Sequence, residues 1–223
     1  MIHVPGNLKL LIRLTAFTVA LAGTGSRIVL SLTGDMGTTV LLFFTVQSNL
    51  MVCLYLGIEL AGRLRRRGSG ESRILPPGLQ GAVMLYIAIT GLVFNVLIAP
   101  GWHPEGVDLL ISRINHTVTP LLFLADWFVS QKRGSYGRRH LGFWLLYPIV
   151  YGITATIEGN RTGEYRYFFL DYSSLGTGRY LVLMGIVTAA FLLTGMILLR
   201  INNLNPYRRR SGESDVSRDR VSD

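Results

Sequence analysis

Six long apolar segments run through this 223-residue chain, and they constrain its fold more than any other feature. A helix needs roughly 20 apolar residues to cross the hydrocarbon core of a bilayer. The segments lie at about 8–32, 38–62, 79–99, 107–130, 140–157 and 178–201. Only 16% of the residues are charged, whereas an ordinary soluble domain has roughly 25%. The sequence therefore predicts an all-α, polytopic membrane protein, a bundle of six transmembrane helices.

The connections between the segments are short, so we predict a single transmembrane domain over residues 1–204. The tail 205–223 is polar and of mixed charge, which predicts disorder. The one cysteine, Cys53, excludes an internal disulfide and a cysteine metal cluster. The four histidines lie on separate elements without the spacing of metal ligands. We therefore expect no metal site and no cofactor, and the sequence indicates no particular oligomeric state.

The basic residues predict the orientation of the chain. Most of the 22 Lys and Arg residues lie near the start of the first segment, after the second and fourth segments, or in the C-terminal tail. The positive-inside rule then places both termini in the cytoplasm, with the chain spanning the plasma membrane. We interpret the net charge of +9 as topology signals and lipid-headgroup contacts, and we expect no nucleic-acid partner.

The first segment has an alternative interpretation as a signal peptide. Lys9 and Arg13 precede an apolar run, and "ALA" at 20–22 resembles a cleavage site. Because the apolar run resumes beyond Arg27 with "IVLSL", an uncleaved first helix is the better interpretation.

The second segment carries polar residues where a bilayer offers no water. Within "FFTVQSNLMV", the residues Thr45, Ser48 and Asn49 stand at i, i+3 and i+4, so they share one helix face. Gln47 points away from that face and is expected to bond another helix. Polar groups inside a span are costly unless they find partners, so this face is expected to meet a second polar surface.

The fourth segment supplies such a surface. Within "SRINHTVTPLLFLAD", the residues Arg113, His116 and Thr119 share a face by the same spacing. Pro120 frees a backbone carbonyl one turn earlier, close to His116, and a neighbouring polar group could occupy it.

Thr45 and His116 are predicted to lie at similar depth. Both segments run inward from the outer surface, and the two residues lie about 11 and 14 Å inside them at 1.5 Å per residue. The two side chains could therefore meet in the outer half of the bilayer. Asp126 lies roughly 15 Å deeper than His116 and cannot orient its ring.

Several interpretations fit these polar faces. A neutral imidazole can activate a hydroxyl nucleophile, and a low dielectric would keep His116 neutral. Ser48, Asn49 or Asn115 could donate to an oxyanion, and Arg113 could bind substrate. The same residues could instead hold helices together, or form the substrate or proton path of a transporter or lipid-binding protein.

The connection at 157–178 is long for a helical bundle and rich in aromatic residues. An aromatic belt at the membrane interface is the simplest interpretation of its members, which are Tyr165, Tyr167, Phe168, Phe169 and Tyr172. The alternative is a lid over the polar pocket, with Arg161 or Arg166 near an acidic headgroup.

Four motifs resemble the bacterial Pr6Pr family of membrane proteins over residues from about 8 to 200. They are "FFTVQSNLMV", "NHTVTPLLFLADW", "YPIVY" and "YRYFFLDY". That family is distantly similar to the androgen-induced gene (FAR-17a-like) family, whose eukaryotic members are intramembrane hydrolases of branched fatty acid esters of hydroxy fatty acids. The resemblance implies a threonine nucleophile at Thr45 and a histidine at His116.

With the resemblance included, we predict an intramembrane hydrolase of lipid or fatty-acid esters, with Thr45 as nucleophile and His116 as base. Its substrate would be a membrane lipid or a lipid-like ester. The alternative is a non-catalytic transporter or lipid-binding protein with a polar intramembrane pocket.

Overall fold

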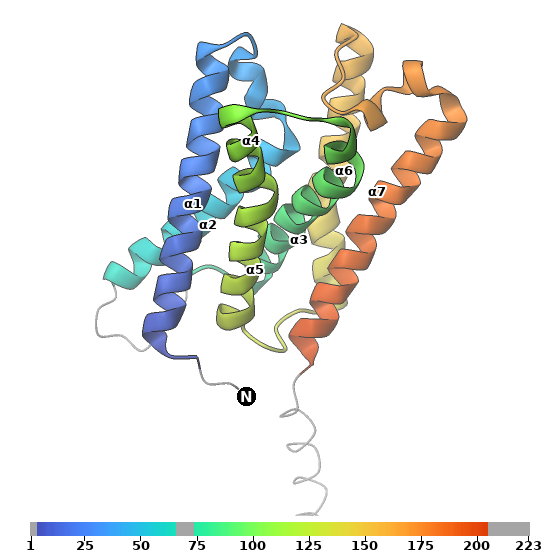
Figure 1. Ribbon diagram of the computed structural model, residues 1–223. Helices are drawn as coiled ribbons and strands as arrows, with labels where there is room; N and C mark the ends of the chain where they lie inside the picture. The colour runs from blue at the N-terminus through green and yellow to red at the C-terminus, as the bar shows by residue number, and fades with distance from the viewer. Residues whose placement is uncertain (1–3, 66–73, 205–223) are drawn as a thin grey trace, which may run out of the picture.

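The computed structural model describes residues 4–65 and 74–204, and the regular elements in these ranges are helices (Figure 1). The tail 205–223, for which the sequence predicts disorder, lies outside the described residues. The long helices are α1 (Gly6–Thr33), α2 (Phe44–Arg65), α3 (Pro77–Val93), α6 (Arg138–Thr162) and α7 (Tyr172–Asn203). The shorter elements are η1 (Gly37–Leu42), η2 (Phe94–Ile98), η3 (Ala99–Gly101), α4 (Gly106–Arg113), η4 (Ile114–Val118), α5 (Thr119–Ser130) and η5 (Phe168–Leu170).

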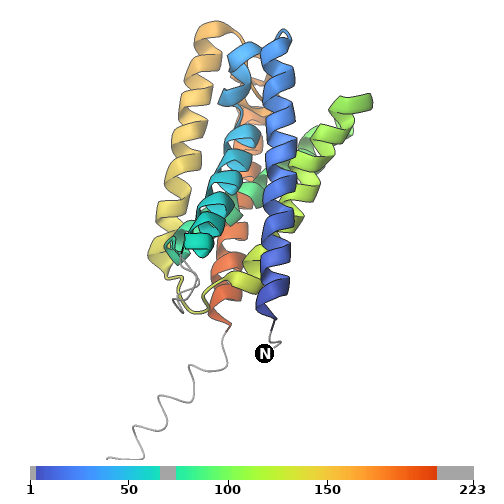
Figure 2. The same cartoon turned by 90° about the vertical axis from the view of Figure 1, so that its left-hand side faces the viewer.

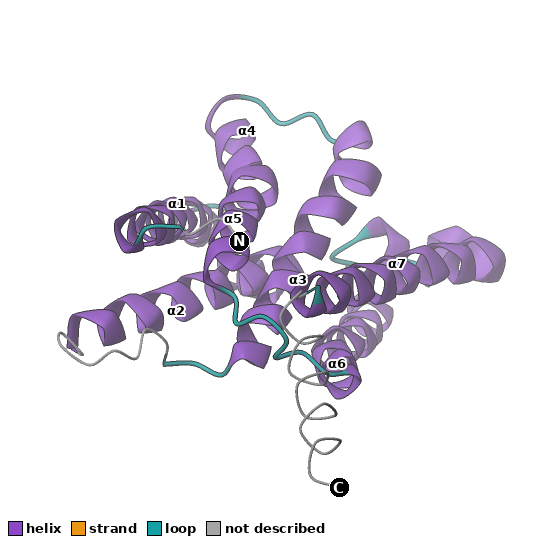
Figure 3. Cartoon of the chain, turned by 90° about the horizontal axis from the view of Figure 1, so that it is seen from below, coloured by secondary structure: helices purple, strands orange, loops and turns teal. Residues whose placement is uncertain are grey.

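Successive helices run in alternating directions between the two ends of the bundle (Figure 1), and α2 and α7 are inclined to α1 (Figure 3). The start of α1 and the end of α7 lie at the same end of the bundle, the lower end in Figures 1 and 2. The start of α2, the α3–α4 connection and the α6–α7 connection lie toward the opposite end.

Five helices are long and apolar enough to cross a membrane: α1, α2, α3 with its continuation to Gly101, α6 and α7. Large apolar side chains of α6 and α7 face outward, among them Phe143 (71% exposed) and Val182 (62% exposed). Such a surface is unfavourable in water and suits lipid. The all-α architecture is thus confirmed over the described residues, and the five apolar helices indicate a multi-pass membrane protein. The predicted span at 107–130 is not one of these five.

The helix α3 is the centre of the bundle (Figure 3). It packs against α2 and α5 on one side and against α6 and α7 on the other. Most of its side chains between Gln80 and Gly91 are buried, which fits a helix that is apolar on all sides. The two sides of the bundle are therefore joined through α3.

The predicted span at 107–130 is divided into three elements. The eight residues of α4 and the twelve of α5 are separated by the five-residue π-helical turn η4. Pro120 accounts for this π-helical turn, which is wider than an α-helical one, because proline has no N–H to donate and its ring clashes with the carbonyl four residues earlier. That carbonyl, His116 O, accepts a hydrogen bond of 3.1 Å from Asn95 Nδ2. The expectation that a polar neighbour would occupy it is confirmed.

The predicted span at 38–62 is also divided. Phe43 is extended, with ψ at 134°, so the turn η1 ends before it and α2 begins at Phe44. Thr45 is consequently the second residue of α2 and does not lie seven residues inside a helix. The other predicted segments extend further than expected, since α6 reaches from Arg138 to Thr162 and α7 begins at Tyr172.

Candidate active site

The structure brings Thr45 and His116 together. Thr45 Oγ1 lies 3.3 Å from His116 Nε2, across the contact between α2 and η4. This separation is longer than an ideal hydrogen bond from a hydroxyl, but hydrogen bonds in unliganded sites often shorten only when substrate is bound. The prediction that these two side chains would meet is confirmed.

The second ring nitrogen of His116 is held by its own helix. Nδ1 lies 2.9 Å from the carbonyl oxygen of Ser112 and 3.2 Å from Ser112 Oγ. A proton on Nδ1 can be donated to that carbonyl, which leaves the Nε2 lone pair directed at Thr45. The ring also stacks on Phe94 with its centroid at 3.6 Å. A backbone carbonyl and an aromatic ring thus orient the imidazole, as a carboxylate does in many hydrolases.

Both backbone groups of Thr45, the carbonyl and the N–H, are hydrogen-bonded to side chains. Its carbonyl accepts hydrogen bonds from Ser48 Oγ at 3.0 Å and from Asn49 Nδ2 at 2.9 Å. Its N–H donates to the hydroxyl of Tyr167 at 3.4 Å. The position of the threonine is therefore fixed by α2 itself and by the α6–α7 connection.

The amides predicted to stabilise an oxyanion donate elsewhere. Asn49 Nδ2 uses its two hydrogens on the carbonyls of Thr45 and, at 3.2 Å, Asn115. Asn115 Nδ2 donates to the carbonyl of Gly23 at 3.2 Å. The Oδ1 atoms of both residues are buried and have no partner in the described part of the chain, and they are acceptors only. These bonds tie α1, α2 and η4 together.

The remaining predicted site residues have different surroundings. Ser48 Oγ lies 2.7 Å from Thr90 Oγ1 on α3. Arg113 is exposed and, among the described residues, makes no hydrogen bond or ion pair with Thr45 or His116. Gln47 accepts a hydrogen bond from Tyr147 of α6, as expected for a residue that bonds another helix.

Close approach of α3 to η4 depends on Gly91. A Cβ atom at this position would lie 2.9 Å from the carbonyl oxygen of His116 and 3.2 Å from Pro120 Cγ. The glycine thus lets Asn95 and Phe94 of the following turn reach the histidine. Phe94 and Asn95 were not predicted as site residues, because their partners come from the fold and not from a local pattern.

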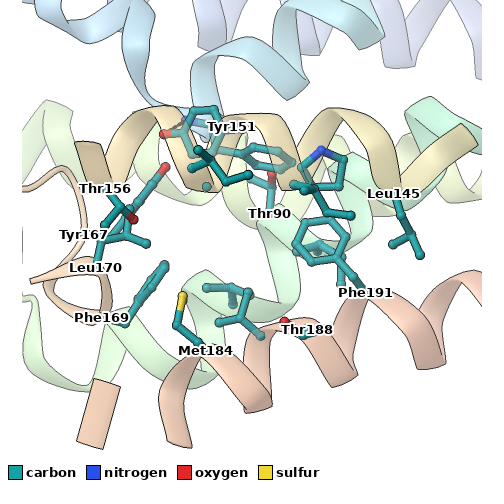
Figure 4. Close-up of a pocket in the computed structure, with 18 of the residues that line it drawn as sticks. Thr90, Leu145, Tyr151, Thr156, Tyr167, Phe169, Leu170, Met184, Thr188 and Phe191 are labelled. Carbon is teal, nitrogen blue, oxygen red and sulfur yellow. Dashed lines mark hydrogen bonds between the residues drawn. The ribbon is translucent and has the colours of Figure 1, made fainter. Parts of the chain in front are cut away.

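A cavity of about 650 Å³ lies between α3, α6 and α7 (Figure 4). Thr45 is one of its lining residues. This volume is in the range of small-molecule sites. Apolar side chains dominate the lining, among them Val93, Phe169, Met184 and Phe191. His116 is behind Thr45 and is not one of the lining residues. The hydroxyl of Thr45 is therefore placed between an apolar cavity and an imidazole.

The rim of the cavity is formed by exposed residues of α6 and α7. Ile149 and Ile153 are each 55% exposed, and Leu192 is 37% exposed. All three line the cavity, so it opens sideways between these helices, on the apolar outer face of the bundle. A ligand can reach it without passing through either end.

Two tyrosines close the cavity near Thr45. The Tyr151 hydroxyl accepts from the Phe44 N–H and donates to the Leu42 carbonyl, both at 3.0 Å. Tyr167 contacts the next N–H along the chain, that of Thr45. Burial raises the pKa of Tyr167, so its hydroxyl keeps its proton at neutral pH.

The position of Tyr167 bears on the two interpretations of the 157–178 connection. Tyr167 and Phe169 reach into the bundle and line the cavity, whereas Phe168 and Tyr172 are exposed. Arg166 pairs with Glu158 of α6. The aromatic composition of this connection was visible in the sequence, but the sequence did not single out Tyr167.

Asp126, in the second half of α5, belongs to a second polar cluster. Arg13 pairs with Asp126 at 2.9 Å and with Glu59 at 3.5 Å. Glu59 Oε1 also accepts from the Leu75 N–H at 2.8 Å, and Gln80 Nε2 donates to Asp126 at 3.4 Å. Arg13 was expected only as an orientation signal, whereas here it neutralises buried carboxylates.

Apolar side chains separate the two polar regions. Val52 and Leu56 of α2 and Phe123 of α5 are fully buried between them. Asp126 does not contact Thr45 or His116 in the described structure, which agrees with the depth predicted from sequence.

Comparison of the chain with protein-family models, with curated proteins and with solved structures finds no match. The resemblance noted in the sequence therefore stays a prediction, and the functional interpretation rests on the geometry above.

Proposed function

We propose that this protein is an intramembrane hydrolase of lipid esters, with Thr45 as the nucleophile and His116 as the general base. The observation that carries the proposal is the 3.3 Å separation of Thr45 Oγ1 and His116 Nε2 at the wall of an apolar cavity. Neither feature alone implies catalysis. A nucleophile and a base that meet beside a hydrocarbon-lined cavity match the needs of ester cleavage in a lipid.

In the proposed reaction His116 Nε2 takes the proton of Thr45 as Oγ1 attacks the ester carbonyl carbon. The electron pair of the C=O bond moves to oxygen and then returns, which breaks the bond to the leaving alcohol. That alcohol takes the proton from His116. A water molecule, activated by His116 in the same way, then cleaves the acyl–threonine ester and releases the fatty acid.

We further infer that the helical path α4–η4–α5 completes a bundle of six membrane crossings with both ends in the cytoplasm. Its 25 residues, Gly106 to Ser130, are continuous in helical structure. The end of α2, the α5–α6 connection and the start of α6 lie toward the end of the bundle where α1 begins (Figure 1). They carry the basic residues Arg63, Arg65, Lys132, Arg133, Arg138 and Arg139. The positive-inside rule makes this end cytoplasmic, so the Thr45–His116 pair lies in the outer half of a plasma membrane.

A transporter is the less well supported alternative. Transport through the polar residues would need a polar path from His116 to Asp126 and the lower end of the bundle. Fully buried Val52, Leu56 and Phe123 occupy that interval, and Asp126 is engaged by Arg13. A pair that apolar side chains separate from Asp126, beside a cavity that opens sideways between α6 and α7, favours hydrolysis.

The test is turnover of medium-chain esters by the purified protein in lipid nanodiscs. We expect Thr45→Ala to reduce turnover to background. Thr154→Ala is the matched control, because Thr154 is not a lining residue of the cavity and its hydroxyl donates, within the described residues, to the carbonyls of Val150 and Tyr151. Equal turnover by wild type and Thr45→Ala would refute the proposal.

A further inference from the structure

Ester cleavage requires a hydrogen-bond donor for the oxyanion that forms as the nucleophile attacks. The donors expected from the sequence, Ser48, Asn49 and Asn115, do not occur among the described residues that line the cavity. The Asn49 amide hydrogens are both held by backbone carbonyls. The donor must therefore come from another residue that faces the cavity beside Thr45.

Among the described hydroxyl groups of the lining, that of Thr90 is engaged by Ser48 at 2.7 Å. Those of Tyr151 and Tyr167 (Figure 4) accept the backbone N–H groups of Phe44 and Thr45 and so lie beside the nucleophile. The Tyr151 proton is engaged by the Leu42 carbonyl at 3.0 Å, and its oxygen accepts the Phe44 N–H. Tyr151 thus fixes the link between η1 and α2. It is a positioning residue for the start of the helix that carries Thr45.

The Tyr167 hydroxyl is differently engaged. It accepts the Thr45 N–H at 3.4 Å and belongs to a residue that lines the cavity. Within the described structure, its own proton makes no hydrogen bond to a backbone carbonyl. A hydroxyl proton rotates to suit its acceptor, so it can turn to a substrate oxygen next to Thr45.

The ring of Tyr167 is held firmly enough to preorganise this donor. It stacks on Phe169 with centroids 5.1 Å apart and an interplanar angle of 5°, and Phe43 meets it edge-on at 5.9 Å. Removal of the hydroxyl alone would leave these ring contacts intact. Preorganised donors of this kind need no rearrangement as charge develops.

We propose that the Tyr167 hydroxyl donates the hydrogen bond that stabilises the oxyanion during attack by Thr45. This inference rests on the proposed function. The negative charge develops on the carbonyl oxygen of the ester, and Tyr167 keeps its proton throughout while His116 carries the transferred one. Tyr167 is then a catalytic residue supplied by the α6–α7 connection, and the connection completes the site.

The first test compares Tyr167→Phe with Tyr165→Phe. Tyr165 lies on the same connection, and its hydroxyl bonds Asn160 away from the cavity. We expect Tyr167→Phe to lower kcat by about 10²-fold, the usual loss on removing one oxyanion donor, with KM nearly unchanged. Tyr165→Phe should keep wild-type kinetics. An unchanged kcat in a folded Tyr167→Phe protein overturns the inference, and so does a loss confined to KM.

A second test applies if the Tyr167→Phe protein does not fold. Fluorinated tyrosine at position 167 keeps the ring and the hydroxyl but makes the phenol a more acidic donor. We expect kcat to change with the degree of fluorination while thermal stability in detergent stays constant. Constant kcat across the series overturns the inference. If the wild type shows no turnover that depends on Thr45, the proposed function is refuted instead. The two failures are therefore distinguishable.

Discussion

The Thr45–His116 pair and the Arg13–Asp126–Glu59 cluster are both polar regions inside an apolar bundle, but they are built in opposite ways. The first consists of neutral groups, borders a cavity of about 650 Å³ and includes a hydroxyl near a ring nitrogen. The second consists of charged groups that bond one another and the surrounding backbone and side chains, with the two carboxylates almost fully buried. Buried charges have to be paired, whereas a neutral hydroxyl can face a cavity at small cost.

This difference separates the two tasks of intramembrane polar residues. The charged cluster joins α1, α2 and α5 at the end where the basic connections lie. The neutral pair places Thr45 at a cavity that opens on the side of the bundle. Substitutions in the two regions should therefore change different observables, activity in one and stability in the other.

The largest effect is expected from His116→Ala. Removal of a general base costs about 10²–10⁴-fold in rate, so we expect ester turnover to fall by about 10³-fold with little change in thermal stability. Steady-state kinetics on the purified protein measures it. His140→Ala is the control, because His140 lies at the opposite end of the bundle near Gly137. Wild-type turnover by His116→Ala would show that the imidazole is not the base.

Asp126→Ala should act on stability. The change leaves the Arg13 guanidinium buried without its closest partner, and breaking a buried pair costs about 3–5 kcal/mol. Thermal or denaturant unfolding in detergent measures the loss. Asp108→Ala removes an ion pair whose aspartate is 58% exposed, and it should change the unfolding free energy little. A stable Asp126→Ala protein that had lost turnover would assign Asp126 to the reaction and remove the distinction between the regions.

Met184→Trp should sharpen the assignment of the cavity. The larger side chain fills space against α6 and α3, so we expect turnover of long-chain esters to fall about 10-fold. Turnover of short-chain esters should change less, because they need less of the cavity. Leu181→Trp is the control, since Leu181 is 61% exposed on the outer face of α7. An equal loss for all chain lengths would contradict the cavity as the acyl site.

Asn95→Ala is expected to have the smallest effect. It removes the amide that satisfies the carbonyl of His116, at a cost of about 1 kcal/mol, and it loosens η4. We expect a several-fold decrease in kcat. Asn203→Ala loses a similar bond, to the carbonyl of Tyr136 at 2.8 Å, far from the pair. Its kcat should match that of wild type, and an equal decrease in both variants would mean that Asn95 acts only through general stability.

Hydrophobic length and helical periodicity predicted the all-α architecture and the encounter of Thr45 with His116, but they predicted six membrane spans where five described helices are long and apolar enough. It did not predict the extended conformation of Phe43, which shifts Thr45 to the start of α2. A single pair of dihedral angles produces that shift, and residue patterns over ten or more positions do not resolve it.

Two further features depend on contacts between distant segments. Tyr167 reaches Thr45 over 122 residues of sequence, and Arg13 reaches Asp126 over 113. A tyrosine in an aromatic-rich connection fits an interfacial belt equally well, and an arginine near the start of a span fits an orientation signal. Only the packing of α1 on α5, and of the α6–α7 connection on α2, distinguishes these roles.

The most direct test of the central claim is to identify the residue that a fluorophosphonate probe modifies in the wild-type protein. Peptide mass spectrometry of the labelled protein locates the adduct. The account predicts modification of the Thr45 hydroxyl, with labelling abolished in Thr45→Ala and strongly slowed in His116→Ala. An adduct on another residue, or labelling that persists in Thr45→Ala, would contradict it.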